Sequence, residues 1–171
     1  LSLSQQQHIQ NMFLLTAKSM LYVANIDENQ IIDSSNSVNM EQLITSVAQN
    51  NNVLIQICGN LEAEIATLPL KEKKDFLLEY NLQQSGLDKL IHAGYKILGL
   101  ETFFTVGDDE VRAWTINKST LAPQAGGKIH TDIERGFIKA EVYSYSDIID
   151  LGSERALRKK GKIRQEGKGY I

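Results

Sequence analysis

The stretch Met20-Leu21-Tyr22-Val23-Ala24 is a short, continuous apolar run, and Val53-Leu54-Ile55-Gln56-Ile57 repeats the pattern with one glutamine. Runs of this length are typical of strands that are buried on both faces. Between them, apolar residues recur at helical spacing behind a cap predicted at Asn39, with Gln42 three residues on: Met40, Leu43, Ile44 and Val47. We therefore predict a strand–helix–strand unit whose strands are neighbours in a parallel sheet.

The loops that follow these two strands begin at Asn25 and Cys58. Strand–helix–strand units cross over with one hand, so both strands end at the same edge of the sheet. Open α/β folds bind their ligands at that edge. We therefore predict that the two loops lie side by side and form the first place to look for a site.

Helices are predicted for most of the chain between Cys58 and residue 100. One pattern runs from Leu61 to Leu68, stops near Pro69 and resumes to Tyr80, and another begins at a capping box, Ser85-Gly-Leu-Asp88. From about residue 100 the sequence pattern becomes typical of strands. The predicted order is a hairpin of strands 102–106 and 111–117, a short helix over 131–135, a strand over 136–142 and a helical stretch over 147–160.

Composition indicates a soluble globular protein. The chain has 171 residues, of which 42% are hydrophobic and 23% charged, and no apolar run approaches the roughly 18 residues of a membrane span. With Cys58 as the single cysteine, no disulfide can form within the chain, so we expect the reducing environment of the cytoplasm. We also expect a monomer without a membrane partner. The opening residues carry neither an initiator Met nor a signal peptide, and we expect a piece of a longer protein.

Positive charge is concentrated near the end of the chain. Residues 152–168 carry seven cations and two carboxylates, a balance of +5, while the net charge of -3 leaves -8 for the remainder. A charge run is often only a solvated face, and the competing interpretation is a local polyanion partner. The candidate residues for contact with RNA or the ribosome are Arg155, Arg158, Lys159, Lys160, Lys162 and Arg164.

Several segments carry a resemblance to a known family. From Phe103 the chain reads F-F-T-V-G-D-D-E-V-R-A-W-T-I, and from Ala122 it reads A-P-Q-A-G-G-K-I-H-T-D-I-E-R-G-F-I-K-A-E-V. These segments resemble the TGS domain of the Obg-like ATPases called YchF or EngD. Upstream, L-L-T-A-K-S-M-L-Y-V-A-N-I-D-E (14–28) and S-G-L-D-K-L-I (85–91) are similar to the same family. The resemblance covers almost the whole chain.

The resemblance implies an α/β fold in two parts. Residues 1–100 would be the base-recognition half of a P-loop NTPase domain of the Obg type, with a parallel sheet, and 1–13 would end a preceding helical segment. Residues 101–171 would be a TGS domain, a ubiquitin-like β-grasp fold of the α+β kind. The family's Gly-rich phosphate loop and the last TGS strand are missing, and we expect truncation or disorder to be the reason.

Asn25-Ile26-Asp27-Glu28 stands where guanine-specific relatives of the family have Asn-Lys-x-Asp. In that pattern the Asp carboxylate accepts from two guanine donors at once. A longer Glu displaces the acceptors, and adenine offers only its 6-amino group on that edge. The resemblance therefore implies that Asn25 and Glu28 contact the base, whereas the tetrapeptide alone is more typical of a polar loop after a strand.

Cys58-Gly59-Asn60 resembles the family's second base-binding loop, in which backbone amides line the pocket. Gly59 permits close approach, and Asn60 is a candidate cap for the next helix. For Cys58 a small buried thiol is the simpler interpretation, because no His lies beside it in sequence.

Other polar and aromatic residues are weaker candidates. His130 and Asp132 lack the further Cys or His that would complete a metal site, and the TGS pattern gives Asp132 a structural role as a helix cap. Trp114 has two interpretations, a core residue or a platform for a nucleic-acid base. We assign neither a catalytic residue nor a metal ligand.

Two functions of different classes follow. The first is a fragment of a ribosome-associated ATPase or GTPase, which would bind ATP or GTP with Mg²⁺ when complete. Hydrolysis needs a phosphate cradle, a Mg²⁺ ligand and a positioned water, so this chain alone is predicted to be inactive and to hold no nucleotide tightly. The second is a stand-alone TGS module that binds ribosomal RNA or protein without nucleotide turnover.

Overall fold

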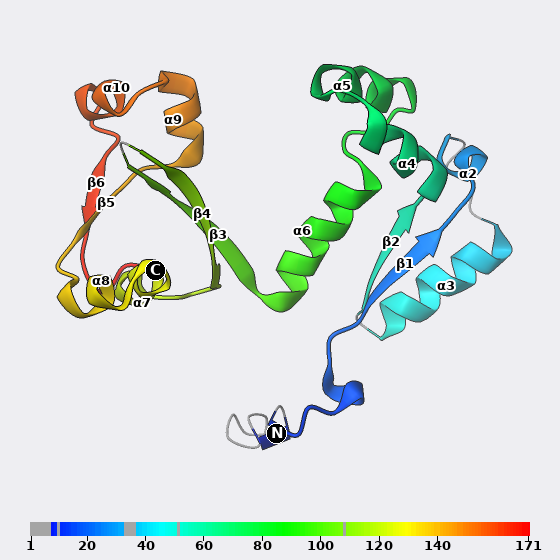
Figure 1. Cartoon of the computed structure of the whole chain (residues 1–171). Helices are drawn as coiled ribbons and strands as arrows, with labels where there is room; N and C mark the ends of the chain where they lie inside the picture. The colour runs from blue at the N-terminus through cyan, green and yellow to red at the C-terminus, as the bar shows by residue number, and fades with distance from the viewer. Residues whose placement is uncertain (1–7, 10, 33–36, 51, 108) are drawn as a thin grey trace. The chain divides into compact units, whose positions relative to one another are not determined.

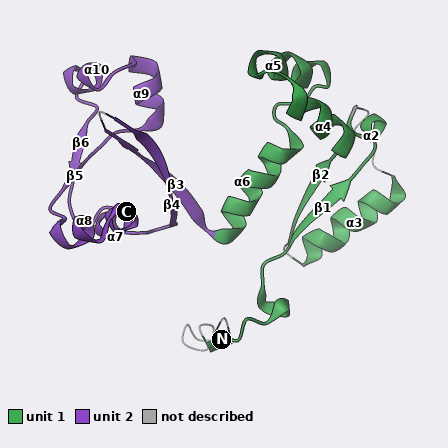
Figure 2. Ribbon diagram, viewed as in Figure 1, with its two compact units in different colours: residues 1–98 green, residues 99–171 purple. Residues whose placement is uncertain are grey.

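The computed structural model describes residues 8–9, 11–32, 37–50, 52–107 and 109–171. The chain divides into two compact units, Leu1–Leu98 and Gly99–Ile171, which are coloured separately in Figure 2. Figure 1 labels the helices and strands. Within the described ranges, no helix combines the length and the apolar character that crossing a membrane requires.

The first unit is built on two parallel strands, β1 (Leu21–Asn25) and β2 (Val53–Ile57). Their register pairs Leu21 with Val53 and Asn25 with Ile57. One further hydrogen bond, from Ile26 N to Ile57 O at 2.8 Å, extends the ladder past the end of β1. The predicted parallel pair is therefore confirmed, and both strands end at the same edge.

Burial differs between the two strands. In β2, Ile55 is buried and its neighbours are half-buried. In β1, Tyr22 and Val23 keep exposed fractions of 36% and 44%, so the prediction of burial on both faces is wrong for this strand. The reason is that β1 pairs only with β2 among the described residues and has little contact with the flanking helices, α3 (Val38–Gln49) and α6 (Gly86–Leu98).

Helix α3 joins the two strands, as the apolar spacing predicts. Its cap is Ser37, whose Oγ accepts a hydrogen bond from Met40 N at 3.3 Å. The prediction of Asn39 as the cap is wrong, because the helix already includes Val38 and Asn39 in its first turn. Val47 is the residue of α3 that is fully buried. Upstream of β1, residues 8, 9 and 11 are helical and Leu15–Ala17 form one turn of 3-10 helix; the rest of the helical end predicted over 1–13 lies partly outside the described residues.

Three helices follow β2 in the first unit: α4 (Gly59–Thr67), α5 (Leu70–Glu79) and α6. Leu61 and Ile65 of α4 form much of the buried core. Ser85 caps α6 as predicted, since its Oγ accepts from Asp88 N at 3.0 Å. The Glu62 carboxylate also accepts from the first two amides of α6, at 2.6 and 3.1 Å. Helices α4 and α6 are therefore tied together by satisfied helix-end donors.

The second unit contains two antiparallel strand pairs. The hairpin of β3 (Leu100–Val106) and β4 (Val111–Asn117) confirms the predicted one, with Phe103 opposite Trp114. The other pair is β5 (Ala140–Val142) with β6 (Arg164–Glu166). The predicted strand over 136–142 is therefore shorter than expected, because α8 (Thr131–Gly136) occupies its beginning.

Helix α7 (Ala122–Ile129) precedes α8 and was not expected from the sequence. Its Gly126 has no room for a side chain, since a Cβ would lie 2.8 Å from Ile133 Cγ2 of α8. The close approach of two helices therefore uses a residue that normally weakens a helix. Tertiary packing, rather than local propensity, explains this helix.

The predicted helical stretch over 147–160 is two helices, α9 (Tyr145–Leu151) and α10 (Glu154–Lys159). Gly152 ends α9 with a φ of 72°, a left-handed conformation that glycine adopts without strain, and Ser153 Oγ caps α10 through Ala156 N. Leu157 of α10 is 0% exposed, and it anchors this end of the unit.

Truncation of that anchor tests the core of the second unit. Leu157→Ala should lower its free energy of unfolding by about 2–5 kcal/mol, because a cavity replaces a fully buried side chain. Urea unfolding followed by the fluorescence of Trp114, the single tryptophan, measures this unit. Ile138→Ala is the matched control, since Ile138 is 79% exposed. Equal losses in both variants would contradict the packing described.

Candidate functional site

The two loops at the carboxyl edge of β1 and β2 meet directly. Gly59 N donates a hydrogen bond to Asn25 Oδ1 at 3.0 Å, which confirms the prediction that they lie side by side. They surround a small hollow of about 270 Å³ lined by Asn25, Ile26, Asp27, Cys58, Gly59 and Asn60. Pockets for complete small-molecule ligands span roughly 300–1,000 Å³. This hollow is therefore of a size for one part of a ligand, such as a purine base.

The second loop is short because α4 begins almost at once. Cys58 is the residue before the helix, is only 3% exposed, and makes no side-chain cap. Gly59 and Asn60 form the first turn, so Asn60 lies inside the helix and the prediction of Asn60 as its cap is wrong. Asn60 is exposed at the rim of the hollow. Cys58 is a buried thiol beside the site.

The first loop closes into a short helix, α2 (Glu28–Ile32). Asp27 Oδ1 accepts from Asn29 N at 3.1 Å, and Gln30 Oε1 accepts from Asp27 N at 3.0 Å. Asp27 thus caps α2 through the Asn29 amide while Gln30 returns a bond to the Asp27 amide, an arrangement close to a capping box that the sequence analysis missed although an acidic residue with Gln three positions later is its signature. Asp27 is therefore partly committed to the backbone, and Glu28 occupies the first helical position.

Glu28 is the one predicted base-contacting residue that does not line the hollow. Its Oε1 accepts a hydrogen bond from the Tyr80 hydroxyl at 2.9 Å. Tyr80 follows the end of α5 and comes from outside both predicted loops. The hydrogen bond to Glu28 is the first cause that raises the pKa of Tyr80 above its ordinary value. The structure thus places Asn25, Cys58, Gly59 and Asn60 together and adds Tyr80 behind Glu28.

The weaker candidates have structural roles. His130 Nδ1 accepts from Asp132 N at 3.2 Å and caps α8, so the prediction of Asp132 as the cap is wrong. Trp114 is half-buried, and its Nε1 donates to Thr105 Oγ1 at 2.9 Å. The Arg112 guanidinium lies 4.3 Å from the centroid of the Trp114 ring, a cation–π contact that covers the ring.

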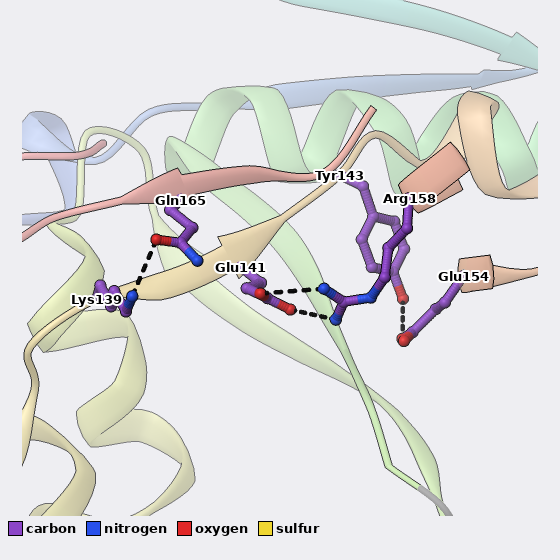
Figure 3. A network of polar contacts seen from close by, with 6 residues as sticks. All are labelled: Lys139, Glu141, Tyr143, Glu154, Arg158 and Gln165. Atoms are coloured by element: carbon purple, nitrogen blue, oxygen red, sulfur yellow. Dashed lines mark hydrogen bonds and ion pairs between the residues drawn. The ribbon is translucent and has the colours of Figure 1, made fainter. Parts of the chain in front are cut away.

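Several residues of the basic segment are held by partners within the second unit. Arg158 Nη1 and Nη2 donate to the Glu141 carboxylate at 3.3 and 2.5 Å, so α10 is tied to β5 (Figure 3). Glu154 of the same helix accepts from the Tyr143 hydroxyl at 3.0 Å. The Arg158 hydrogen bonds hold the pKa of Glu141 below its ordinary range.

The other cations fall into two groups. Lys162 pairs with Asp147 of α9 at 3.1 Å, and Arg164 lies 3.7 Å from Glu166. The remaining three have neither an ion pair nor a side-chain hydrogen bond among the described residues and are exposed: Arg155, Lys159 and Lys160. They lie on or directly after α10, and among the six candidate cations only these three leave their charge uncompensated by a described residue; Lys168, outside the candidate set, is also exposed without an ion pair to a described residue.

Comparison with known proteins agrees with this architecture. The family model YchF-GTPase_C, described as a protein of unknown function (DUF933), matches residues 100–171. The chain is 45% identical to the ribosome-binding ATPase YchF of Bacillus subtilis over 167 residues, which is 98% of this chain and 46% of that protein. A solved structure of the Schizosaccharomyces pombe YchF GTPase matches all of this chain and 45% of its own, with a TM-score of 0.85 and 34% identity.

The chain belongs to the YchF family of Obg-like ATPases. Human Obg-like ATPase 1 is also 45% identical, over 92% of this chain and 40% of its own length. The chain thus spans a little under half the length of the YchF relatives it matches. Both loops of the hollow lie within the stretch shared with the S. pombe YchF GTPase, since that match covers the whole chain.

The Glu141–Arg158 pair of this YchF-family chain predicts a pH dependence. The folded-state pKa of Glu141 lies below its ordinary value of 4.5, so its contribution to stability is present above that pH and is lost as pH falls through the folded value. The urea midpoint of the second unit should therefore drop below about pH 4.5, and Glu141→Gln should flatten this drop. The effect is modest because the two side chains are 42% and 57% exposed.

Trp114 fluorescence follows the midpoint between pH 3 and 7. Glu101→Gln is the control, because Glu101 is exposed on β3 and has no ion pair among the described residues. A variant at Glu141 that keeps the full acid-side loss would contradict this account of the pair.

Proposed function

We propose that this chain supplies the base-recognition half of a nucleotide-binding domain and a ribosome-binding module of a YchF-type NTPase. The hydrogen bond between Asn25 Oδ1 and Gly59 N carries this proposal. It joins the two loops that follow parallel strands, at the sheet edge where α/β folds bind ligands. The B. subtilis and S. pombe relatives are named an ATPase and a GTPase, which supports a nucleotide as the ligand.

The residues present fit a purine base. With Oδ1 of Asn25 taken by Gly59, its amide nitrogen keeps two donors for a ring nitrogen such as N7. Glu28 supplies a carboxylate acceptor for the exocyclic amine of adenine, with guanine as the competing base. Cys58, Gly59 and Asn60 line the same hollow and would contact the base through their backbone.

The residues do not fit the triphosphate and Mg²⁺. Those groups require a Gly-rich loop with a Lys and a Ser or Thr, and the sequence has no such motif. We therefore route no hydrolytic step through this chain. Its own residues bind and orient the base, and the complete protein would supply the phosphate site and the turnover of ATP or GTP.

The second unit is the proposed ribosome-binding module, a TGS domain with a β-grasp fold. The B. subtilis relative is named a ribosome-binding ATPase, which supports the ribosome as the partner and the cytoplasm as the location. Among the six candidate cations, the three without internal partners are the ones available to RNA phosphates: Arg155, Lys159 and Lys160. Arg158, Lys162 and Arg164 would act mainly in holding the module together.

A stand-alone binding module remains the second candidate function. One observation favours it: the second unit has its own buried anchor, Leu157, and the family model matches this unit by itself. On this proposal the module would bind RNA or ribosomal protein without any contribution from nucleotide.

Titration with ATP tests base recognition. In a ¹⁵N-labelled chain, millimolar ATP should shift the Gly59 amide and the Asn25 side-chain amide, and no phosphate should be released, because the site lacks its phosphate half. Tripolyphosphate is the control, since it carries the same kind of charge without a base and should leave both signals unchanged. Shifts that tripolyphosphate reproduces, or no shift with ATP, would rule out base binding here.

Ribosome co-sedimentation across a salt series tests the module. Replacing Arg155, Lys159 and Lys160 by Gln should weaken binding and lessen the slope of log affinity against log salt by roughly two units, at about 0.7–0.9 per phosphate contact. The matched control replaces three lysines of α5 by Gln: Lys71, Lys73 and Lys74. Equal affinity and slope in all three proteins would remove this surface from the interaction.

A further inference from the structure

Tyr80 is held in place by the end of α5. It is the residue at which the helix stops, and its ring lies 5.0 Å from that of Phe76, one turn earlier. Asn81 follows with a φ of 52°, and Leu82 N donates to Leu77 O at 2.8 Å, a Schellman motif that closes the helix. The phenol therefore has few alternative positions.

The Tyr80 hydroxyl is directed at one oxygen of Glu28. The contact joins Tyr80 Oη to Glu28 Oε1 at 2.9 Å, and both side chains are half-buried. Oε2 has no hydrogen-bond partner among the described residues. A phenol is protonated at neutral pH and acts here as the donor, and the pKa of Tyr80 is raised further, first by this hydrogen bond and then by burial.

The bond to Oε1 matters because guanine and adenine present different numbers of hydrogen-bond donors to a carboxylate. Guanine presents N1–H and its 2-amino group side by side, and a carboxylate accepts from both only when it is free to turn its two oxygens toward them together. Adenine presents a single donor, the 6-amino group, for which one oxygen is enough. A carboxylate whose orientation and first oxygen are fixed by a phenol suits adenine better than guanine.

We propose that Tyr80 is a positioning residue that biases this site toward adenine by engaging Oε1 of Glu28 and leaving Oε2 as the acceptor for the base. The inference rests on the proposed base-recognition function. It adds a determinant that lies 52 residues from Glu28 and outside the Asn25–Glu28 motif. Specificity for the base would then be shared between the motif and the end of α5.

Removal of the phenol oxygen tests the proposal. Tyr80→Phe keeps the ring packed on Phe76 and frees Oε1, so the ratio of GMP to AMP affinity should rise by about fivefold or more. The ratio is obtained from titrations of the ¹⁵N-labelled chain with each monophosphate, read at the Gly59 amide. Tyr145→Phe is the matched control, because Tyr145 is an exposed tyrosine of the second unit and lies outside the proposed base site.

Glu28→Ala separates the failure of this inference from that of the proposed function. If Glu28→Ala changes the GMP to AMP ratio and Tyr80→Phe leaves it unchanged, Glu28 reads the base and Tyr80 does not position it. If neither variant changes the ratio, or no nucleotide shifts the Gly59 amide, base recognition itself is overturned. A Tyr80→Phe variant with a lower melting temperature and an unchanged ratio assigns Tyr80 a purely structural tie between α2 and α5, which also overturns the proposal.

Discussion

The hydrogen bond from Gly59 N to Asn25 Oδ1 is the contact on which the first unit's chemistry depends. It is possible only because β1 and β2 run parallel in a register that ends both strands together. The bond uses the side-chain acceptor of Asn25 and leaves its amide nitrogen as donor, so the fold itself selects what the site can offer. The capping of α2 by Asp27 then sets Glu28 at the start of a helix. The backbone of the two loops thus sets the positions of Asn25, Asp27 and Glu28 near the hollow.

In the second unit, some cations form ion pairs within the fold and others remain without a partner among the described residues. Arg158 and Lys162 pair with carboxylates of β5 and α9, so they contribute to holding short elements against one another. Arg155, Lys159 and Lys160, on and directly after α10, have no such partner among the described residues. A basic segment that looks uniform in sequence therefore contains both internal ties and free charges. Net charge alone does not distinguish them, because both kinds count equally in it.

Local signals in the sequence were sufficient for β1 to β4 and for the Ser85 cap, because apolar runs, the hairpin turn and the capping pattern act within a few residues. The short strand β6 was not predicted, since three residues of a basic segment carry no strand pattern of their own. Local signals were also not sufficient for α7, whose Ala-Pro-Gln-Ala-Gly-Gly segment has a loop-like composition and depends on packing against Ile133. The same limit applies to the candidate site. Its loops could be paired from topology, but the partner of Glu28 lies 52 residues away, and no local pattern indicates that contact.

The buried thiol of Cys58 makes the rate of its chemical modification a measure of local opening in the first unit. It is the single cysteine of the chain, is 3% exposed and sits where β2 ends. A thiol reagent can reach it only when this edge of the sheet opens, so the modification rate follows the local opening equilibrium there. Since the second unit contributes no thiol, its unfolding does not change the modification rate of Cys58. The chain therefore carries one independent reporter for each unit, a sulfur atom in the first and an indole ring in the second.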